Sequence, residues 1–211
     1  MSEQNSERRS VSPVSIIEKI PAEREKELIE RAKHDDIVAF EELIAGHQRT
    51  VYNFALYLTN DKVLAQDIAQ EALVKVFRSL KSFRGDCPFT TWIYRVVRNV
   101  FLDELRRAHN KHKNEHVPFE ELHNVVTAQA KPGRSDEEDA QLLRQVLHEA
   151  MRKLPTDMRT PLVMYELQGF SYEEISQVEG VAVNTIKSRI FRARQYLTQD
   201  ASLRECWAQL T

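Results

Sequence analysis

Apolar residues recur at helical spacing in two long stretches of the chain. In residues 26–111 the repeat is clear at Ile37, Phe40, Leu43 and Ile44, and again at Val51, Phe54, Ala55 and Leu58. In residues 140–200 it returns at Ile186, Ile190, Ala193 and Leu197. Spacings of three and four residues place side chains on one face of an α-helix. The pattern therefore predicts an all-α protein with two small helical domains, at residues 26–111 and 140–200.

The helical repeat is absent from the three remaining segments. Residues 1–25 are polar and include two prolines, which predicts a flexible N-terminal tail. Residues 112–139 have an acidic end and contain Pro118, Pro132 and Gly133, so a linker is expected there. Residues 201–211 are expected to form a C-terminal tail that docks on the second domain through Trp207 and Leu210.

The second domain ends in three predicted helices that are separated by short turns. Ser171 and Glu174 have the spacing of a capping box, in which the two side chains start a helix reciprocally. Gly169 and Gly180 are expected to adopt the left-handed conformation that ends one helix and allows a tight turn before the next. This order of elements is typical of a helix-turn-helix, whose last helix enters the major groove of DNA.

The last of these helices carries four basic residues and no acidic residue between Asn184 and Tyr196. Basic side chains neutralise phosphates, while Arg, Lys, Ser and an aromatic ring can contact base edges and thymine methyl groups. The residues expected to bind duplex DNA are Thr185, Lys187, Ser188, Arg189, Phe191, Arg192 and Arg194. The alternative is a solvated surface helix, which the unbalanced charge disfavours. Ala182 gives this helix a weak N-terminal cap.

The net formal charge of −2 conceals a strongly basic segment. Between Lys75 and Lys113 there are ten basic and three acidic residues, a local excess of seven positive charges that favours a polyanionic partner. The first residues lack the apolar core of a signal peptide, and no apolar run approaches the roughly 20 residues that span a bilayer. Cys87 and Cys206 show no metal-binding spacing, so a cytoplasmic protein is expected.

A helix predicted at residues 89–107 presents an aromatic ring, cations and an amide on the face opposite its apolar stripe. Such a face suits single-stranded nucleic acid, because rings stack on unpaired bases and cations hold the backbone. The loop before it, residues 83–89, could accept a flipped-out base. The residues expected to bind unpaired DNA are Phe83, Arg84, Trp92, Arg95, Asn99 and Arg106. In the alternative interpretation, Trp92 belongs to the core and the cations are solvated.

Another predicted helix, at residues 67–78, has a mixed face with an apolar centre. This face consists of Asp67, Gln70, Glu71, Val74 and Arg78. It resembles a protein-docking surface, although an ordinary amphipathic helix explains the pattern equally well.

Two motifs together resemble the extracytoplasmic-function sigma factors, which are small bacterial initiation factors of the sigma-70 family. The motifs are DIAQEALVKVFRSLKSFRGDCPFTTWIYRVVRNVFLDELRR and, after a linker, LQGFSYEEISQVEGVAVNTIKSRIFRAR. The resemblance covers residues 26–110 and 140–200. It implies that residues 26–111 form sigma domain 2, that residues 140–200 form sigma domain 4, and that the protein directs RNA polymerase to promoters.

The resemblance also implies a partner for each face. The face with Asp67, Gln70 and Glu71 would bind the clamp helices of core RNA polymerase, whose flap would be a further contact. Loop 83–89, with Trp92 and Asn99, would capture and melt the minus-ten element. Lys187, Ser188, Phe191 and Arg192 would contact the minus-thirty-five element. The linker would thread toward the active-site and RNA-exit channels. An anti-sigma factor, often bound at the inner membrane face, would regulate the protein.

Three other functions compete with this interpretation. A sigma-like decoy that binds an anti-sigma factor without promoter recognition would be expected to lose both the basic helix and the Trp92–Asn99 face. A conventional helix-turn-helix regulator leaves the basic segment without a purpose. A helical enzyme lacks any catalytic constellation, and neither a cofactor, a metal nor a small-molecule substrate is expected. His109, His112 and His116 have no Cys or carboxylate partner at metal-binding spacing.

Overall fold

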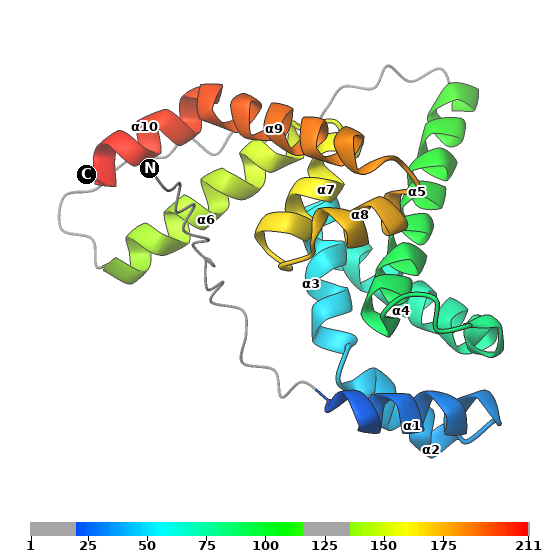
Figure 1. Cartoon of the computed structure of the whole chain (residues 1–211). Helices are drawn as coiled ribbons and strands as arrows, with labels where there is room; N and C mark the ends of the chain where they lie inside the picture. The colour runs from blue at the N-terminus through cyan, green and yellow to red at the C-terminus, as the bar shows by residue number, and fades with distance from the viewer. Residues whose placement is uncertain (1–19, 116–135, 211) are drawn as a thin grey trace.

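The computed structural model describes residues 20–115 and 136–210, and within these ranges it contains helices and no strand. Domain 2 consists of α1 (Ala22–Lys33), α2 (Ile37–Ala45), α3 (Gln48–Thr59), α4 (Lys62–Ser79), the 3-10 turn η1 (Leu80–Ser82) and α5 (Phe89–Glu115). Domain 4 consists of α6 (Asp136–Arg152), α7 (Thr156–Glu166), α8 (Tyr172–Glu179), α9 (Val183–Gln199) and α10 (Ala201–Leu210). The predicted all-α fold is confirmed (Figure 1).

Helices extend into all three segments in which a tail or linker was predicted. Helix α1 begins at Ala22, inside the predicted N-terminal tail, and acidic residues in its first turn complement the helix dipole. Helix α5 continues to Glu115 and α6 begins at Asp136, so the predicted linker is shorter at both ends. Its remaining residues, 116–135, lie outside the described part of the chain. The predicted C-terminal tail is helix α10, which packs on α6.

The core of domain 2 lies where α3, α4 and α5 meet. Phe54 and Tyr94 are buried there, with their ring centroids 4.5 Å apart. Helix α4 buries the stripe of Ile68, Ala69, Ala72 and Val76, with Leu73 partly buried beside it. Asp61 starts α4 by accepting hydrogen bonds from the backbone N–H groups of Val63 and Leu64. The polar residues of α4 opposite this stripe, such as Asp67 and Gln70, are exposed.

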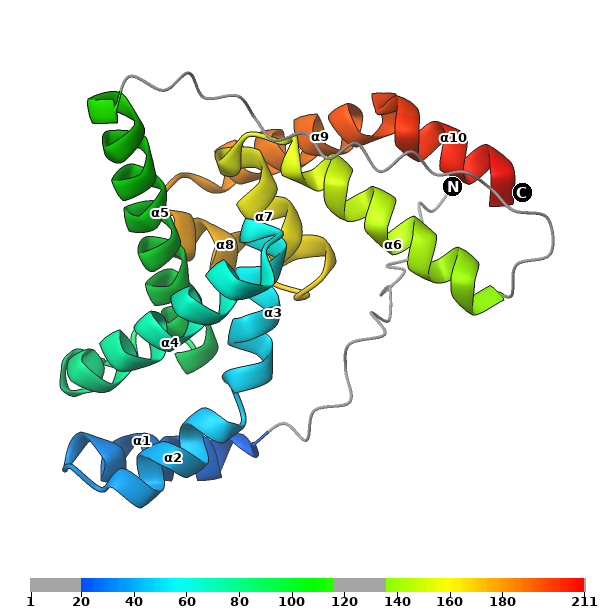
Figure 2. The same ribbon diagram turned by 180° about the vertical axis from the view of Figure 1, so that it is seen from behind.

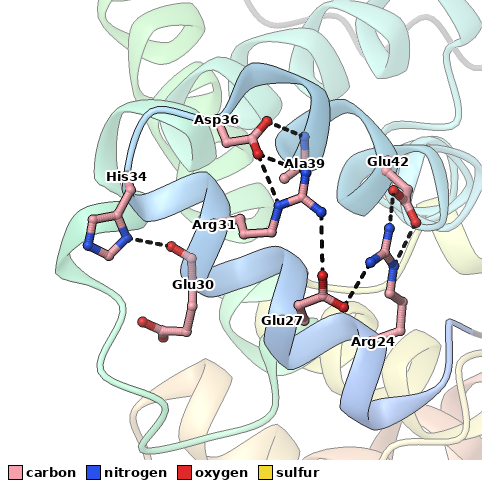
Figure 3. A network of polar contacts seen from close by, with 8 residues as sticks. All are labelled: Arg24, Glu27, Glu30, Arg31, His34, Asp36, Ala39 and Glu42. Carbon is pink, nitrogen blue, oxygen red and sulfur yellow. Dashed lines mark hydrogen bonds and ion pairs between the residues drawn. The ribbon is translucent and has the colours of Figure 1, made fainter.

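A network of polar contacts joins α1 to α2 at the far end of domain 2 (Figure 3). Arg24 donates to both carboxylate oxygens of Glu42, at 2.9 and 2.7 Å. Arg31 binds Asp36, and the same Asp36 caps α2 by accepting from the N–H of Ala39 at 3.0 Å. This N–H and the neighbouring guanidinium lower the pKa of the Asp36 carboxyl. Because these ion pairs are exposed, they contribute little to stability and mainly fix how α1 and α2 are aligned.

The predicted helix-turn-helix is confirmed in α7, α8 and α9. Gly169 and Gly180 have φ values of 73° and 69°, the left-handed conformation that a side chain would disfavour. The capping box is also present. Ser171 Oγ accepts a hydrogen bond from the Glu174 N–H, while a Glu174 oxygen accepts from the Ser171 N–H at 2.8 Å. The short α8 therefore has a defined start and a defined end.

Replacing Ser171 by alanine should destabilise domain 4 by about 1 kcal/mol, because the first turn of α8 loses an acceptor for an unpaired N–H. The measurement is chemical unfolding followed by circular dichroism. Ser171→Asp is the matched control, since it keeps an acceptor at the same position and should retain most of the stability. Equal destabilisation by both substitutions would contradict a role in capping.

The two domains pack directly on each other, through α3 against α6 and α7 and through α5 against α8 (Figures 1 and 2). Arg159 of α7 donates to the carbonyl oxygen of Leu58 in α3 at 2.6 Å, and also to two carbonyls of its own domain. The Asn60 amide donates to Glu149 at 3.0 Å. His148 stacks on Tyr57 with centroids 4.9 Å apart, and burial lowers its pKa. The contact between the two domains thus includes polar interactions between residues far apart in sequence.

Candidate nucleic-acid interface

Helix α9 buries one stripe and turns a cationic and aromatic face outward. Ile186, Ile190 and Ala193 are buried, as predicted. Phe191 is 60% exposed although it is a large apolar side chain. The remaining exposed residues of the predicted set are Thr185, Lys187, Ser188, Arg192 and Arg194. On such a face the ring can contact a thymine methyl group while the cations neutralise phosphates.

Two predicted DNA contacts of α9 are held by neighbouring carboxylates. Arg189 is only 22% exposed and lies 3.4 Å from Glu179 and 3.5 Å from Asp157. Arg194 is paired with Glu166 of α7 and lies over the Tyr165 ring, 5.4 Å from its centroid. Each contact ties α9 to another helix of domain 4. These two arginines therefore help to orient α9, in contrast to the fully outward Phe191 and Arg192.

The first turn of α9 has no side-chain cap, which confirms the expectation for Ala182. Ser188 donates its hydroxyl to the carbonyl of Asn184 at 2.9 Å and stays exposed. Lys187 lies over the Tyr172 ring, 5.5 Å from its centroid. Polar groups at this end of α9 are accordingly placed at its surface.

The face predicted to bind unpaired DNA is divided by the structure into exposed and packed residues. Asn99 of α5 and Arg84 of the loop are exposed, and Arg106 is exposed beside Asp103 at 3.0 Å. Phe83 is only 7% exposed, because it packs into an aromatic cluster with Phe89. In this conformation the Phe83 ring cannot stack on a base.

Trp92 occupies the boundary between the core and the surface. Its ring stacks on Phe89 with centroids 5.7 Å apart and tilts against Phe83 at 5.1 Å. Trp92 is nevertheless half-buried rather than enclosed. The indole thus packs on the core, as in the alternative interpretation, and its role in binding unpaired DNA stays a prediction.

Two arginines of the same α5 face contact α8 of domain 4. Arg95 donates to the carbonyl oxygen of Gln177 at 2.9 Å. Arg98 binds both oxygens of Glu179, at 2.6 and 3.1 Å. Neither Arg98 nor Glu179 was among the predicted site residues. A sequence pattern does not identify their pairing, because the two residues lie 81 positions apart.

The face of α4 predicted to dock a protein is open. Asp67, Gln70 and Arg78 are exposed, and Val74 is 48% exposed. Glu71 is 3.0 Å from Lys75, and this hydrogen bond lowers the pKa of the Glu71 carboxyl. The face also includes Phe77, which is 45% exposed and was missed. Its position three residues after Val74 is the signal that could have identified it.

No group of three potential metal ligands occurs among the residues that the structure describes. Neither Cys87 nor Cys206 forms a disulfide. None of the helices described is both long and apolar enough to cross a bilayer.

The sequence matches two family models. Sigma-70 region 2 matches residues 43–111, and Sigma-70, region 4 matches residues 144–197. The RNA polymerase sigma-H factor of Pseudomonas aeruginosa is 34% identical over 176 residues, which is 82% of this chain and 91% of that protein. The ECF RNA polymerase sigma-E factor of Escherichia coli is 36% identical over 172 residues, 80% of this chain and 89% of that protein.

Two solved structures have a similar fold. The sigma factor RpoE in complex with the anti-sigma factor NepR from Bartonella quintana has a TM-score of 0.61 and 26% identity, covering 76% of this chain and 94% of that one. CnrH in complex with the cytosolic domain of CnrY has the same TM-score at 23% identity, covering 83% and 95%, and shows the shared fold. The two matched regions, the similarity along most of the chain and the exposed cationic helix together show that this chain belongs to the extracytoplasmic-function sigma factors of the sigma-70 family.

Proposed function

We propose that α9 reads the minus-thirty-five element as duplex DNA. The observation that carries this proposal is the outward face of α9, where Phe191 and Arg192 project from a helix whose opposite side is fully buried. Arg192, Lys187 and Ser188 have the chemistry for base edges and phosphates. Thr185 contributes at the first turn, while Arg189 and Arg194 orient the helix and contact phosphates.

Domain 2 binds the minus-ten element as a single strand in this proposal. Asn99 reads a base edge, the accessible part of Trp92 contacts a base, and Arg84, Arg95 and Arg106 hold the backbone. Phe83 supports the Trp92 ring instead of meeting a base itself, which departs from the sequence-based prediction. A preference for unpaired over paired bases opens the duplex without a nucleotide cofactor, because binding shifts the melting equilibrium.

The core polymerase interface is the exposed face of α4, formed by Asp67, Gln70, Glu71, Val74, Arg78 and the neighbouring Phe77. It has an apolar centre and a charged rim, which is the composition of a typical protein interface. Domain 2 extends from α1 to α5, and domain 4 extends from α6 to α10. The factor works in the cytoplasm without catalysing covalent chemistry, and an anti-sigma factor controls its access to polymerase.

Run-off transcription tests this proposal. The purified chain and core RNA polymerase together should initiate at discrete sites on genomic fragments, and neither should do so alone. Mapping of the start sites should reveal paired upstream elements at constant spacing. A chain that bound core polymerase without ever initiating would instead be a decoy. Tight binding to an operator without polymerase association would favour a conventional helix-turn-helix regulator.

A further inference from the structure

The interface between α5 and α8 joins the two domains through polar side chains. We call it the α5–α8 interface, and its members are Tyr94, Arg95, Arg98, Gln168, Phe170, Gln177 and Glu179. The Tyr94 hydroxyl donates to the Gln168 amide oxygen at 2.6 Å, and its ring contacts Phe170 at 4.7 Å. These polar contacts add to apolar packing, because buried residues of both domains belong to one core cluster.

Glu179 is the centre of this interface. Its side chain is only 1% exposed, and its carboxylate lies between Arg98 of domain 2 and Arg189 of α9. A buried carboxylate is tolerated when it is paired and hydrogen-bonded, as it is here. If the domains separated, Glu179 would keep Arg189 and gain water, so opening would not strand a buried charge. The contact is therefore suited to being made and broken.

The same interface occupies a surface that DNA needs. Arg95 and Arg98 belong to the basic segment, yet one donates to Gln177 and the other is neutralised by Glu179. Both are only partly exposed. A nucleic-acid strand on this part of α5 would have to displace α8. Arg189 of α9 is also engaged by Glu179, so one carboxylate binds cations of both α5 and α9.

We propose that the free protein inhibits itself, with α8 of domain 4 covering the α5 face and Glu179 acting as a latch on Arg98. The assignment of that face to the minus-ten strand rests on the proposed function. The segment that covers the α5 face is α8 of the same chain, and the hydrogen bonds from Arg95 and Arg98 hold it there. A partner that binds only the separated domains meets a lower apparent affinity, reduced by the fraction of molecules that are open.

Glu179→Gln in the full-length chain tests the latch. Loss of the charge should favour the open form, which small-angle X-ray scattering detects as an increased radius of gyration. Titration with core polymerase should then show an affinity about tenfold higher than that of the wild type, equivalent to about 1.4 kcal/mol. The control is Glu166→Gln, which removes a carboxylate from the ion pair with Arg194 inside domain 4. It should change neither measurement.

Arg98→Gln removes the partner of Glu179 in domain 2 and should increase the radius of gyration of the free protein in the same way. The double variant should expand it no further than either single variant, because both remove one interaction. The proposal would be overturned if the two substitutions increased the radius of gyration additively, or if the wild-type protein already had the radius of gyration of an open form. It would also be overturned if Glu179→Gln changed neither the radius of gyration nor the affinity for core polymerase. Scattering requires no promoter, so failure of the latch and failure of the proposed DNA contacts remain distinguishable.

Discussion

Replacing both Phe191 and Arg192 by alanine is expected to lower minus-thirty-five-dependent transcription by roughly 100-fold or more, because each good base contact contributes about 1–3 kcal/mol. The two side chains are exposed on α9, so their truncation leaves the buried stripe intact. Run-off transcription by the reconstituted holoenzyme measures the loss, and a titration with core polymerase should give wild-type affinity. Circular dichroism should show unchanged helicity.

The matched control is Gln195→Ala with Gln199→Ala, at exposed positions nearer the other end of α9. Helix-turn-helix proteins contact bases mainly through the N-terminal residues of the last helix. These substitutions should therefore reduce transcription much less. If the Phe191 and Arg192 substitutions weakened core binding as much as promoter use, their role would be structural and the assignment of this face to DNA would be wrong.

Arg159→Ala is expected to destabilise the protein by about 3 kcal/mol, because the buried guanidinium makes several hydrogen bonds to carbonyls. Arg159 donates to Leu58 at 2.6 Å, to Arg152 at 2.7 Å and to Leu154 at 2.9 Å. Truncation would leave these oxygens without their donor between α3, α6 and α7. Burial lowers the pKa of Arg159, because the charged guanidinium is partly desolvated. Its removal therefore also removes this desolvation cost, which offsets part of the lost hydrogen bonding. Thermal unfolding should shift down by roughly 6–12 °C.

Arg159→Lys and Arg144→Ala complete this test. Lysine keeps the charge but lacks the planar fork that reaches several acceptors, so it should recover less than half of the lost stability. Arg144 is an exposed residue of α6, and its replacement by alanine should change stability by at most about 0.5 kcal/mol. If Arg159→Ala were as mild as Arg144→Ala, these hydrogen bonds would contribute little in solution.

Local signals in the sequence predicted the helix-turn-helix well. The capping box at Ser171 and the left-handed glycines at 169 and 180 depend on neighbouring residues alone, and all are confirmed. The buried stripe of α9 follows from helical periodicity, and it is confirmed at Ile186, Ile190 and Ala193. The predicted bounds of helices were less reliable, because α1 begins inside a polar stretch whose composition alone suggested a tail.

Contacts between distant residues were not predictable from the same signals. Periodicity places Trp92 and Arg95 on the polar side of a helix. It does not reveal that Phe83 of the preceding loop packs against Trp92, or that α8 contacts Arg95. Phe83 was expected at the surface and is buried, because Phe89 and Trp92 close over it. Pairing of Arg98 with Glu179 depends on how the domains associate, and no local pattern encodes that association.

The junction between α9 and α10 carries a further consequence. Asp200 accepts from the Leu203 N–H at 3.1 Å, starting α10, and its carboxylate binds Lys153 at 2.8 Å. Cys206 of α10 is fully buried, which fixes α10 to domain 4. The far end of α9 is thus anchored before any promoter is met. A pre-organised helix loses little conformational entropy on binding, so more of its contact energy appears as affinity for DNA.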